Sequence, residues 1–260
     1  MIMAFDVGNS ETTIGLYEGD SIRAHWRVTT AVDRTPDELA LLIRELLSLR
    51  RHEVASIRGS VIASVVPALT RPLADACAAS FDRVAVVVDA SSPLPIRLAV
   101  DEPLTVGADR VVNTLAASRL YGRDTIVVDL GTATTFDCIT SDGIFLGGVI
   151  APGVRTSADT LIRRTAKLPA TELTPPLKVI GTRTEDCIRA GVVFGAADAV
   201  DGIVLRIKRA WPRPDTPFVV ATGGLAETVQ NICTSFDLVA PQLTLEGLRM
   251  AYQIISGEAP

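Results

Sequence analysis

One segment of the chain occurs twice, and this repeat constrains the fold more than any other feature of the sequence. Residues 2–13 and 125–136 each begin as an apolar strand and continue through Asp, an apolar residue, Gly, small polar residues and Thr. The aligned positions are Asp6 with Asp129, Gly8 with Gly131 and Thr12 with Thr135. Because the offset of 123 is close to half of the 260 residues, the repeat predicts two domains of like fold, residues 1–117 and 118–260.

The pattern after each copy predicts the same architecture twice. A turn signal and a third apolar stretch follow, which indicate a three-stranded meander; the turn signals are Glu18-Gly19-Asp20 and Ser141-Asp142-Gly143. Further strands are predicted at residues 60–66, 84–88 and 218–221, and helices at residues 36–47, 69–79, 109–120, 184–210 and 243–255. Strands followed by strand–helix alternation, twice over, indicate an α/β fold with a mixed sheet in each half.

Small residues add local predictions in the second half. Gly147-Gly148 begins a glycine-rich turn that leads into a helix, and Thr182 or Thr184 is expected to cap the long helix after it. The glycines inside that helix, which predict close packing against another backbone, are Gly191, Gly195 and Gly202.

Composition narrows the class of protein. The chain is 48% hydrophobic and 21% charged, which excludes a disordered chain, and its net charge of -5 argues against a binder of nucleic acid or anionic membranes. With His25, His52 and four scattered cysteines, no zinc pattern can be drawn, and the cysteines are expected to be free thiols. No signal peptide and no apolar run of about 18–20 residues is visible, so a soluble cytoplasmic protein is expected.

The two Asp-x-Gly turns predict a phosphate site. A tight turn that contains Gly exposes successive backbone N–H groups to phosphate oxygens, and a carboxylate at the end of a buried strand suits a cation. A single turn of this kind is more simply explained as hairpin chemistry. The duplication, with its Thr and Ser residues, favours phosphate binding, although neither G-x-x-x-x-G-K-[ST] nor G-x-G-x-x-G occurs.

Two further motifs permit both a structural and a chemical interpretation. In Gly107-Ala108-Asp109-Arg110, Asp109 is either a helix N-cap or a general base for a bound hydroxyl, with Arg110 on an anionic group. Thr222-Gly223-Gly224 is either a plain strand-to-helix turn or a surface on which a flat group such as adenine lies against backbone.

Together these elements resemble the type III pantothenate kinases, of the acetate and sugar kinase, heat-shock chaperone and actin superfamily. The resemblance covers essentially the whole chain, and the motifs stand in family order. They are Asp6-Val7-Gly8-Asn9-Ser10, Gly107-Ala108-Asp109-Arg110, Asp129-Leu130-Gly131-Thr132-Ala133-Thr134-Thr135, Gly147-Gly148-x-x-x-Pro152-Gly153 and Thr222-Gly223-Gly224. The superfamily shares the phosphate motifs loosely, whereas the substrate motif and the short chain point to this family.

The resemblance implies a fold and an activity. The fold would be two tandem RNase H-like (actin-like ATPase) domains with mixed sheets and ATP in the cleft, as a homodimer. The activity would be phosphorylation of pantothenate to 4'-phosphopantothenate, the first step of coenzyme A biosynthesis. Magnesium would accompany the ATP, and a monovalent cation, potassium or ammonium, would be required.

The resemblance also implies roles, carried over by motif match. Asp109 would be the proton acceptor, Asp129 would hold the monovalent cation, and Asp6 would be the protein contact for magnesium. The residues expected to contact ATP are Asp6, Val7, Gly8, Asn9, Ser10, Glu11, Thr12, Thr13 and Thr132. The residues expected to line the pantothenate site are Gly107, Ala108, Asp109, Arg110 and Thr184.

One departure keeps alternatives open. Family members often carry a Tyr that contacts pantothenate three residues before the proline preceding the substrate motif, and this chain has Val100 there, ahead of Pro103. The rival interpretations are a kinase of another small alcohol and a non-catalytic nucleotide-binding regulator of the same fold. Retention of Asp109 favours catalysis.

Overall fold

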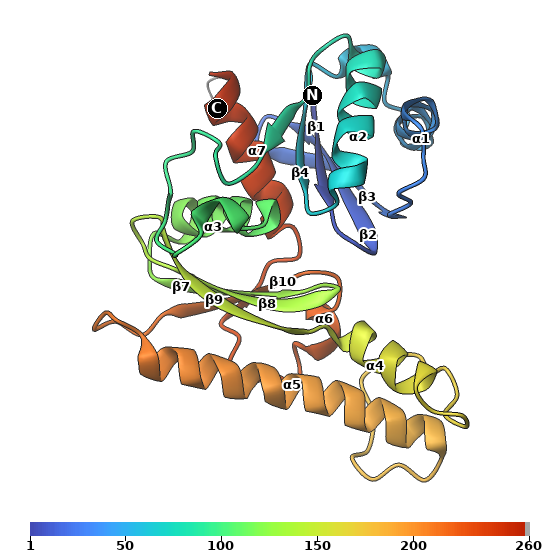
Figure 1. The fold of residues 1–260 in the computed structure, drawn as a ribbon, viewed down its shortest axis with the longest axis vertical. Helices are drawn as coiled ribbons and strands as arrows, with labels where there is room; N and C mark the ends of the chain where they lie inside the picture. The colour runs from blue at the N-terminus through green and yellow to red at the C-terminus, as the bar shows by residue number, and fades with distance from the viewer. Residues whose placement is uncertain (258–260) are drawn as a thin grey trace. The chain divides into compact units, whose positions relative to one another are not determined.

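The computed structural model describes residues 1–257, and the chain divides into two compact units (Figure 1). Unit 1 comprises residues 1–120 and the chain from Leu243 onward, and unit 2 comprises Tyr121–Gln242. These units differ from the predicted halves chiefly in the last helix, which belongs to unit 1.

Unit 1 contains a mixed sheet in the order β3-β2-β1-β4-β5. Its meander is antiparallel, whereas β4 and β5 are parallel to β1. The strands are β1 (Ile2–Val7), β2 (Glu11–Glu18), β3 (Ser21–Thr29), β4 (Gly59–Ser64) and β5 (Val86–Val88), followed by the two-residue β6 (Arg97–Leu98). The predicted meander and both later strands are therefore confirmed.

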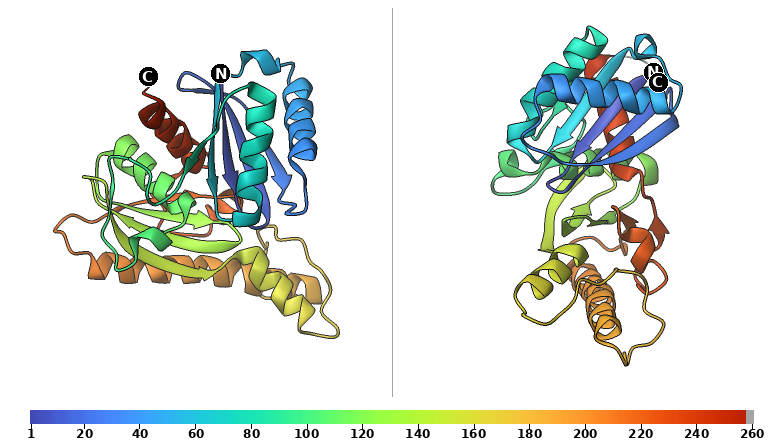
Figure 2. Two further views of the ribbon diagram at one scale, coloured as in Figure 1. Left: turned by 45° about the horizontal axis from the view of Figure 1, so that its top comes forward. Right: turned by 90° about the vertical axis from the view of Figure 1, so that its right-hand side faces the viewer.

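Helices cover both faces of the unit 1 sheet (Figures 1 and 2). They are α1 (Pro36–Leu49), α2 (Pro67–Phe81), α3 (Ala108–Tyr121) and α7 (Leu243–Ser256), with short 3₁₀ turns at Val54–Ser56 and Pro103–Thr105. Alternate residues of β1 face opposite ways: Met3 and Phe5 pack with α1 and α2, whereas Ile2 and Ala4 pack with α3 and α7. By the same alternation, Asp6 lies on the α3 and α7 face.

Unit 2 repeats this arrangement, with its strands in the order β9-β8-β7-β10-β11. The meander is again antiparallel, and β10 and β11 are parallel to β7. The strands are β7 (Thr125–Leu130), β8 (Ala133–Ile139), β9 (Ile144–Pro152), β10 (Phe218–Thr222) and β11 (Leu238–Val239); the helices are α4 (Val154–Arg163), α5 (Thr184–Ala210) and α6 (Ala226–Val229). The α/β fold with two mixed sheets of like topology is confirmed.

The equivalence of the two meanders corrects the predicted alignment by one residue. Thr12 pairs with Val7 in unit 1, and Thr134 pairs with Leu130 in unit 2. Thr134, rather than Thr135, is therefore the counterpart of Thr12. The reason is that the second turn is one residue shorter, a change that a fixed sequence offset cannot detect.

Three local predictions in unit 2 were wrong. Arg183, not Thr182 or Thr184, occupies the N-cap of α5, without a side-chain hydrogen bond. Gly147 and Gly148 lie inside β9 rather than in a turn. A Cβ added to a glycine within α5 would meet nothing within 4 Å, so no backbone packs there in the described chain; these glycines are Gly191, Gly195 and Gly202.

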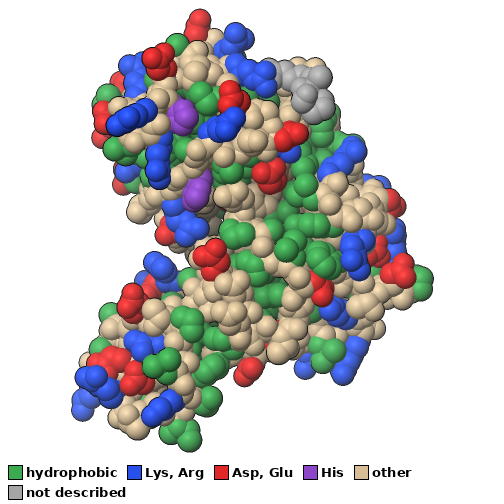
Figure 3. Space-filling model, turned by 180° about the vertical axis from the view of Figure 1, so that it is seen from behind, with side chains coloured by type: hydrophobic (Ala, Val, Ile, Leu, Met, Phe, Trp, Pro, Cys, Tyr) green, Lys and Arg blue, Asp and Glu red, His purple; other side chains and the backbone are tan. Residues whose placement is uncertain are grey.

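All four cysteines are free, as expected; Cys77 and Cys233 are buried, whereas Cys187 is exposed. The histidine side chains reach the surface (Figure 3). Within residues 1–257, no helix combines the length and the apolar character needed to cross a membrane.

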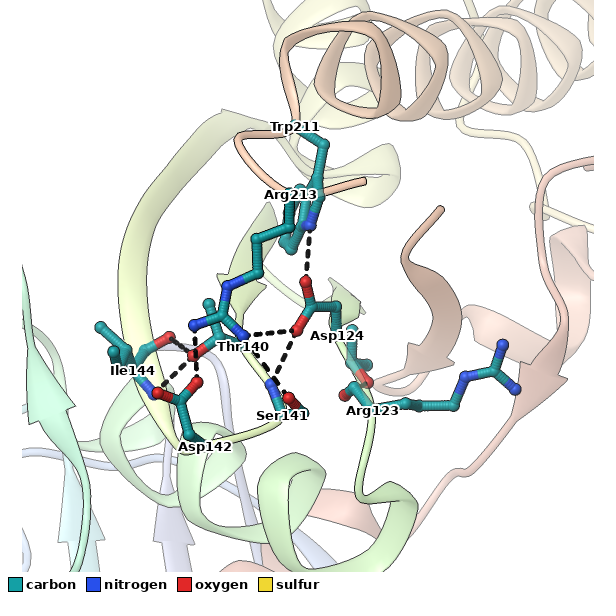
Figure 4. A network of polar contacts seen from close by, with 9 residues as sticks. Arg123, Asp124, Thr140, Ser141, Asp142, Ile144, Trp211 and Arg213 are labelled. Carbon is teal, nitrogen blue, oxygen red and sulfur yellow. Dashed lines mark hydrogen bonds and ion pairs between the residues drawn. The ribbon is translucent and has the colours of Figure 1, made fainter. Parts of the chain in front are cut away.

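A polar network lies at the end of the unit 2 sheet where β7 begins, opposite the end that carries the Asp129 turn (Figure 4). Its centre is the buried Asp124 carboxylate, which accepts from Trp211 Nε1 at 2.8 Å, the Ser141 backbone N–H at 2.9 Å and Arg213 Nη1 at 3.3 Å. Arg213 also pairs with the exposed Asp142 at 2.7 Å. Asp124 thus joins the start of β7, the β8–β9 turn and the loop after α5.

Replacement of Asp124 by Ala should destabilise unit 2. The change leaves the Trp211 indole and the Ser141 N–H without their acceptor, and buried donors that lose a partner cost about 1–3 kcal/mol each. Chemical denaturation followed by tryptophan fluorescence measures the loss. The control is Asp142→Ala, which removes an exposed partner of the same arginine and should change stability little; equal losses in both variants would contradict the central role of Asp124.

Candidate active site

The first phosphate turn lies at the carboxyl end of β1. The backbone N–H of Gly8 donates to the Glu11 carbonyl at 3.1 Å, and a Cβ added at Gly8 would lie 2.9 Å from that oxygen. A side chain at this position would therefore displace the turn. Asn9, Ser10 and Glu11 are exposed, so their side chains and backbone are accessible to a ligand.

Thr30, which follows β3, braces this turn. Its hydroxyl donates to the Gly8 carbonyl at 2.7 Å and lies 2.9 Å from the Thr12 hydroxyl, and its backbone N–H donates to the Ser10 carbonyl at 3.0 Å. Thr12 is buried, as is Val7, so these two predicted contact residues support the turn from below. Sequence reasoning missed Thr30, because its role depends on the return of the third strand and leaves no local signal.

The substrate motif begins α3 at the same edge of the unit 1 sheet. The Gly107 carbonyl accepts the first helical bond, from Val111 N–H, so Gly107 precedes the helix and Asp109 is not its N-cap. A Cβ added at Gly107 would lie 3.5 Å from Val65 Cγ1, and Val65 N–H donates to the Val7 carbonyl at 3.0 Å. Through Val65, the Asp109 segment adjoins the end of β1.

Desolvation is the largest influence on the pKa of the Asp109 carboxyl. It raises the pKa of this carboxyl above the ordinary value, while the Arg110 backbone N–H, at 2.8 Å, and the Arg110 charge oppose that rise. A partly desolvated carboxylate with a raised pKa is a stronger proton acceptor than one in water. The environment therefore suits the base assignment.

Two glycine backbones pack against the second phosphate turn in unit 2. A Cβ added at Gly153 would overlap the Thr132 carbonyl, which also accepts from Thr156 Oγ1 at 2.6 Å. A Cβ added at Gly223, whose φ is +87°, would overlap Asp129 Oδ1 and lie 2.7 Å from Leu130 N. Close backbone approach, rather than sequence distance, thus explains why Gly153 and Gly223 accompany this turn.

Thr222 brings a second oxygen beside Asp129. The two residues are directly registered on β10 and β7 and lie on the same face of the sheet, opposite the α5 core. The Thr222 hydroxyl is buried and has no hydrogen-bond partner among the described residues. A carboxylate beside a neutral hydroxyl oxygen offers the oxygen ligands that hard cations prefer.

The predicted site residues are divided between the units. Residues 6–13 and 107–110 share one edge of the unit 1 sheet, whereas Asp129, Thr132 and Thr184 belong to unit 2. Thr184 is exposed at the first turn of α5 and is distant in sequence from the Asp129 turn. No cluster of three or more His, Cys, Asp or Glu side chains suited to a metal occurs in residues 1–257.

Comparison with known proteins identifies the family. The family model for type III pantothenate kinase matches residues 2–206. The type III pantothenate kinase of Acidothermus cellulolyticus is 45% identical over 254 residues, covering 97% of this chain and 98% of the relative. The chain belongs to the type III pantothenate kinase family. It is therefore a kinase, and a second relative, from Roseiflexus castenholzii, is 44% identical over 98% of this chain and 99% of its own.

Solved structures confirm the fold of this type III pantothenate kinase family member. A Campylobacter jejuni protein described as a Baf family transcriptional activator matches with a TM-score of 0.59 and 19% identity, covering 98% of this chain and 99% of the other. MreB 5 of Spiroplasma citri, bound to AMPPNP, matches with a TM-score of 0.55 and 12% identity, covering 98% and 97%. Both units therefore have the actin-like ATPase fold.

Replacement of Gly223 by Ala should weaken the second turn. The new methyl group would meet Asp129 and would require an unfavourable positive φ, so we expect a lower melting temperature and weaker nucleotide binding. Calorimetric titration with an ATP analogue and thermal denaturation measure both. Gly202→Ala is the control, because it places the same methyl group in open space on a helix and should stabilise by roughly 0.5–1 kcal/mol.

Proposed function

We propose that this kinase transfers the γ-phosphoryl group of ATP to the primary hydroxyl of pantothenate, giving 4'-phosphopantothenate in the first step of coenzyme A biosynthesis. The observation that carries the proposal is the family match, over residues 2–206 and with a relative 45% identical over 97% of the chain, together with the half-buried Asp109 at the start of α3, beside the end of β1. The protein acts in the cytoplasm as a homodimer, without nucleic acid or membrane.

Backbone N–H groups of the two Asp-x-Gly turns hold the ATP phosphates, in place of a lysine-containing G-x-x-x-x-G-K-[ST] loop. The residues that contact ATP are Asp6, Gly8, Asn9, Ser10, Glu11 and Thr13 on unit 1 and Thr132 on unit 2, while the buried Val7 and Thr12 support the first turn from below. Support for this comes from the exposed backbone of the first turn and from the exposed Thr132 of the second. Backbone N–H groups at such turns neutralise phosphate oxygens without reorganising during the reaction.

Two cations fit the residues present. Asp6 ends a buried strand on the face shared with α3 and is the protein contact for Mg²⁺, while Asp129 and the Thr222 hydroxyl hold K⁺ or NH₄⁺. Bound cations supply charge neutralisation for the phosphates during transfer.

Asp109 accepts the proton of the substrate hydroxyl. As the alcohol oxygen forms its bond to the γ-phosphorus, the bond to the bridging oxygen of ADP breaks and the hydroxyl proton moves to the Asp109 carboxylate. Arg110, Gly107 and Ala108 hold pantothenate beside this base, and Thr184 completes the substrate site. Positioning accounts for most of the acceleration.

Asp109→Asn should remove the base and spare ATP binding. We expect turnover to fall by roughly 100-fold or more, with nucleotide affinity unchanged, in a coupled assay of ADP release with pantothenate. Because the raised pKa shows that the ionised carboxylate is disfavoured in the fold, the neutral amide should not lower the melting temperature at pH 7. Substantial remaining turnover in the variant would contradict the assignment.

The cation site gives a second prediction. Thr222→Val keeps the shape of the side chain and removes its hydroxyl, so the K⁺ concentration that half-maximally raises the melting temperature in the presence of ADP should increase. Thr125→Val is the matched control, since Thr125 is buried at the other end of β7 and its hydroxyl donates to the Arg123 carbonyl at 2.9 Å. An unchanged K⁺ response in Thr222→Val would remove Thr222 from the site.

Val100 supports one alternative, a kinase of another small alcohol. Its half-buried side chain lacks the phenolic hydroxyl that the family often places there. ADP release with a panel of small alcohols selects this alternative if pantothenate gives no signal and another alcohol does. Nucleotide binding without turnover of any alcohol would select a non-catalytic regulator.

A further inference from the structure

The helix that carries Asp109 also carries a buried amide with one unused end. Asn113 is 1% exposed on α3, and its Oδ1 accepts from Thr244 Oγ1 of α7 at 3.0 Å. Its Nδ2 is buried and has no hydrogen-bond partner among the described residues. A buried donor without a partner destabilises the fold through its desolvation cost, so a role in binding or catalysis would explain why it is present.

Asn113 stands four residues after Asp109 and therefore on the same face of α3. Side chains of a helix lean toward its N-terminus and cover the turn that precedes them. The preceding turn here contains Asp109 and Arg110. This spacing places Asn113 one helical turn from Asp109 on the same face of α3, and the acceptor end of its amide is already engaged by Thr244.

Close packing fixes the helix that supplies Thr244. A Cβ added at Gly247 of α7 would overlap the Val112 carbonyl of α3, so the two backbones touch one residue before Asn113. Thr244 lies three residues before Gly247 and faces the same helix. Farther along α7, the buried Arg249 pairs with Asp20 at 2.5 Å and with Glu246 at 3.1 Å, which anchors α7 to the meander.

We infer that Asn113 is a positioning residue for Asp109: Thr244 orients the amide, and its Nδ2 donates to the Asp109 carboxylate when substrate is bound. The inference rests on the proposed function, in which Asp109 is the base. A base oriented by a neighbour that is itself oriented by a third group is a general arrangement in catalysis. Catalytic hydrogen bonds often tighten only in the substrate complex.

The arrangement has a definite electrostatic consequence. Among the described residues, the charge that acts on the Asp109 carboxyl comes from Arg110 on its own helix; the acidic Glu246 of α7 is engaged by Tyr17 and Arg249. A donor from Asn113 would favour the ionised carboxylate and lower its pKa. Loss of that donor should therefore raise the pKa of Asp109 further.

The decisive variant is Thr244→Val, which frees the amide without altering α3. We expect kcat to fall by roughly 10-fold, the size usual for a group that orients an active residue, with the KM values for ATP and pantothenate little changed. The acidic limb of kcat/KM should move to higher pH, because the base must be ionised. Thr244→Ser, which restores the hydroxyl, should recover both properties.

A titration of the carboxyl tests the inference without turnover. In protein labelled with ¹³C-aspartate, the resonance missing from Asp109→Asn identifies Asp109, and its pKa should be higher in Thr244→Val and in Asn113→Leu than in the parent chain. Ser118→Ala is the control, because it removes a hydroxyl bonded to the Leu115 carbonyl at 3.0 Å near the other end of α3.

The outcomes separate the two proposals. If Thr244→Val melts at a lower temperature but keeps the parent pH profile and the parent pKa of Asp109, the Thr244–Asn113 pair only joins two helices and the inference is overturned. If the parent chain releases no ADP with pantothenate, the proposed function fails, while the titration still reports whether Asn113 acts on Asp109.

Discussion

The buried central strand of each unit ends in a carboxylate that the surrounding sheet holds in place. β1 and β7 have the same burial pattern, with every residue buried except the half-buried Asp6 and Asp129. Each strand is paired on one side with an antiparallel neighbour and on the other with a parallel one. A slip of one residue would turn the aspartate into the core, so the apolar residues of the strand fix the position of the charge.

Much of this frame can be predicted from the sequence, because it depends on local patterns. The period of the apolar residues and the turn signals identified both meanders, and the helix predicted at residues 36–47 is α1, which Thr35 caps. The residues of the two phosphate turns follow from the strand ends for the same reason. What depends on contacts between distant segments could not be predicted: the amphipathic pattern of α7 shows that it covers a sheet, but not which one. Its place in unit 1 depends on side chains such as Leu245 against Gly15 and Tyr252 against Gly59.

The same limit applies to the candidate site. Asp109 was identified from its motif, yet its environment is set by Val65 beside Gly107 and by the contact of Gly247 with Val112. Thr30, Asn113 and Thr244 carry no local signal, since each acts on a residue far away in the chain or one helical turn away. The predicted packing of the α5 glycines was wrong for the converse reason: a helix with small residues permits close approach, but only a neighbouring segment makes it happen.

The two units have the same sheet topology but differ in the residues that follow the parallel strand beside each central strand. The strand pairings make Ala63 of unit 1 the counterpart of Thr222, and Ser64 the counterpart of Gly223. In unit 1, the Ser64 hydroxyl bonds to the backbone of Val66 and closes the loop on itself. In unit 2, Gly223 brings its backbone against Asp129, and the Thr222 hydroxyl stays buried beside that carboxylate. A side chain at position 223 would exclude this approach, whereas Ser64 needs its side chain to form the loop. The same strand end therefore gives a loop that supports the Asp109 segment in one unit and an oxygen-lined turn in the other.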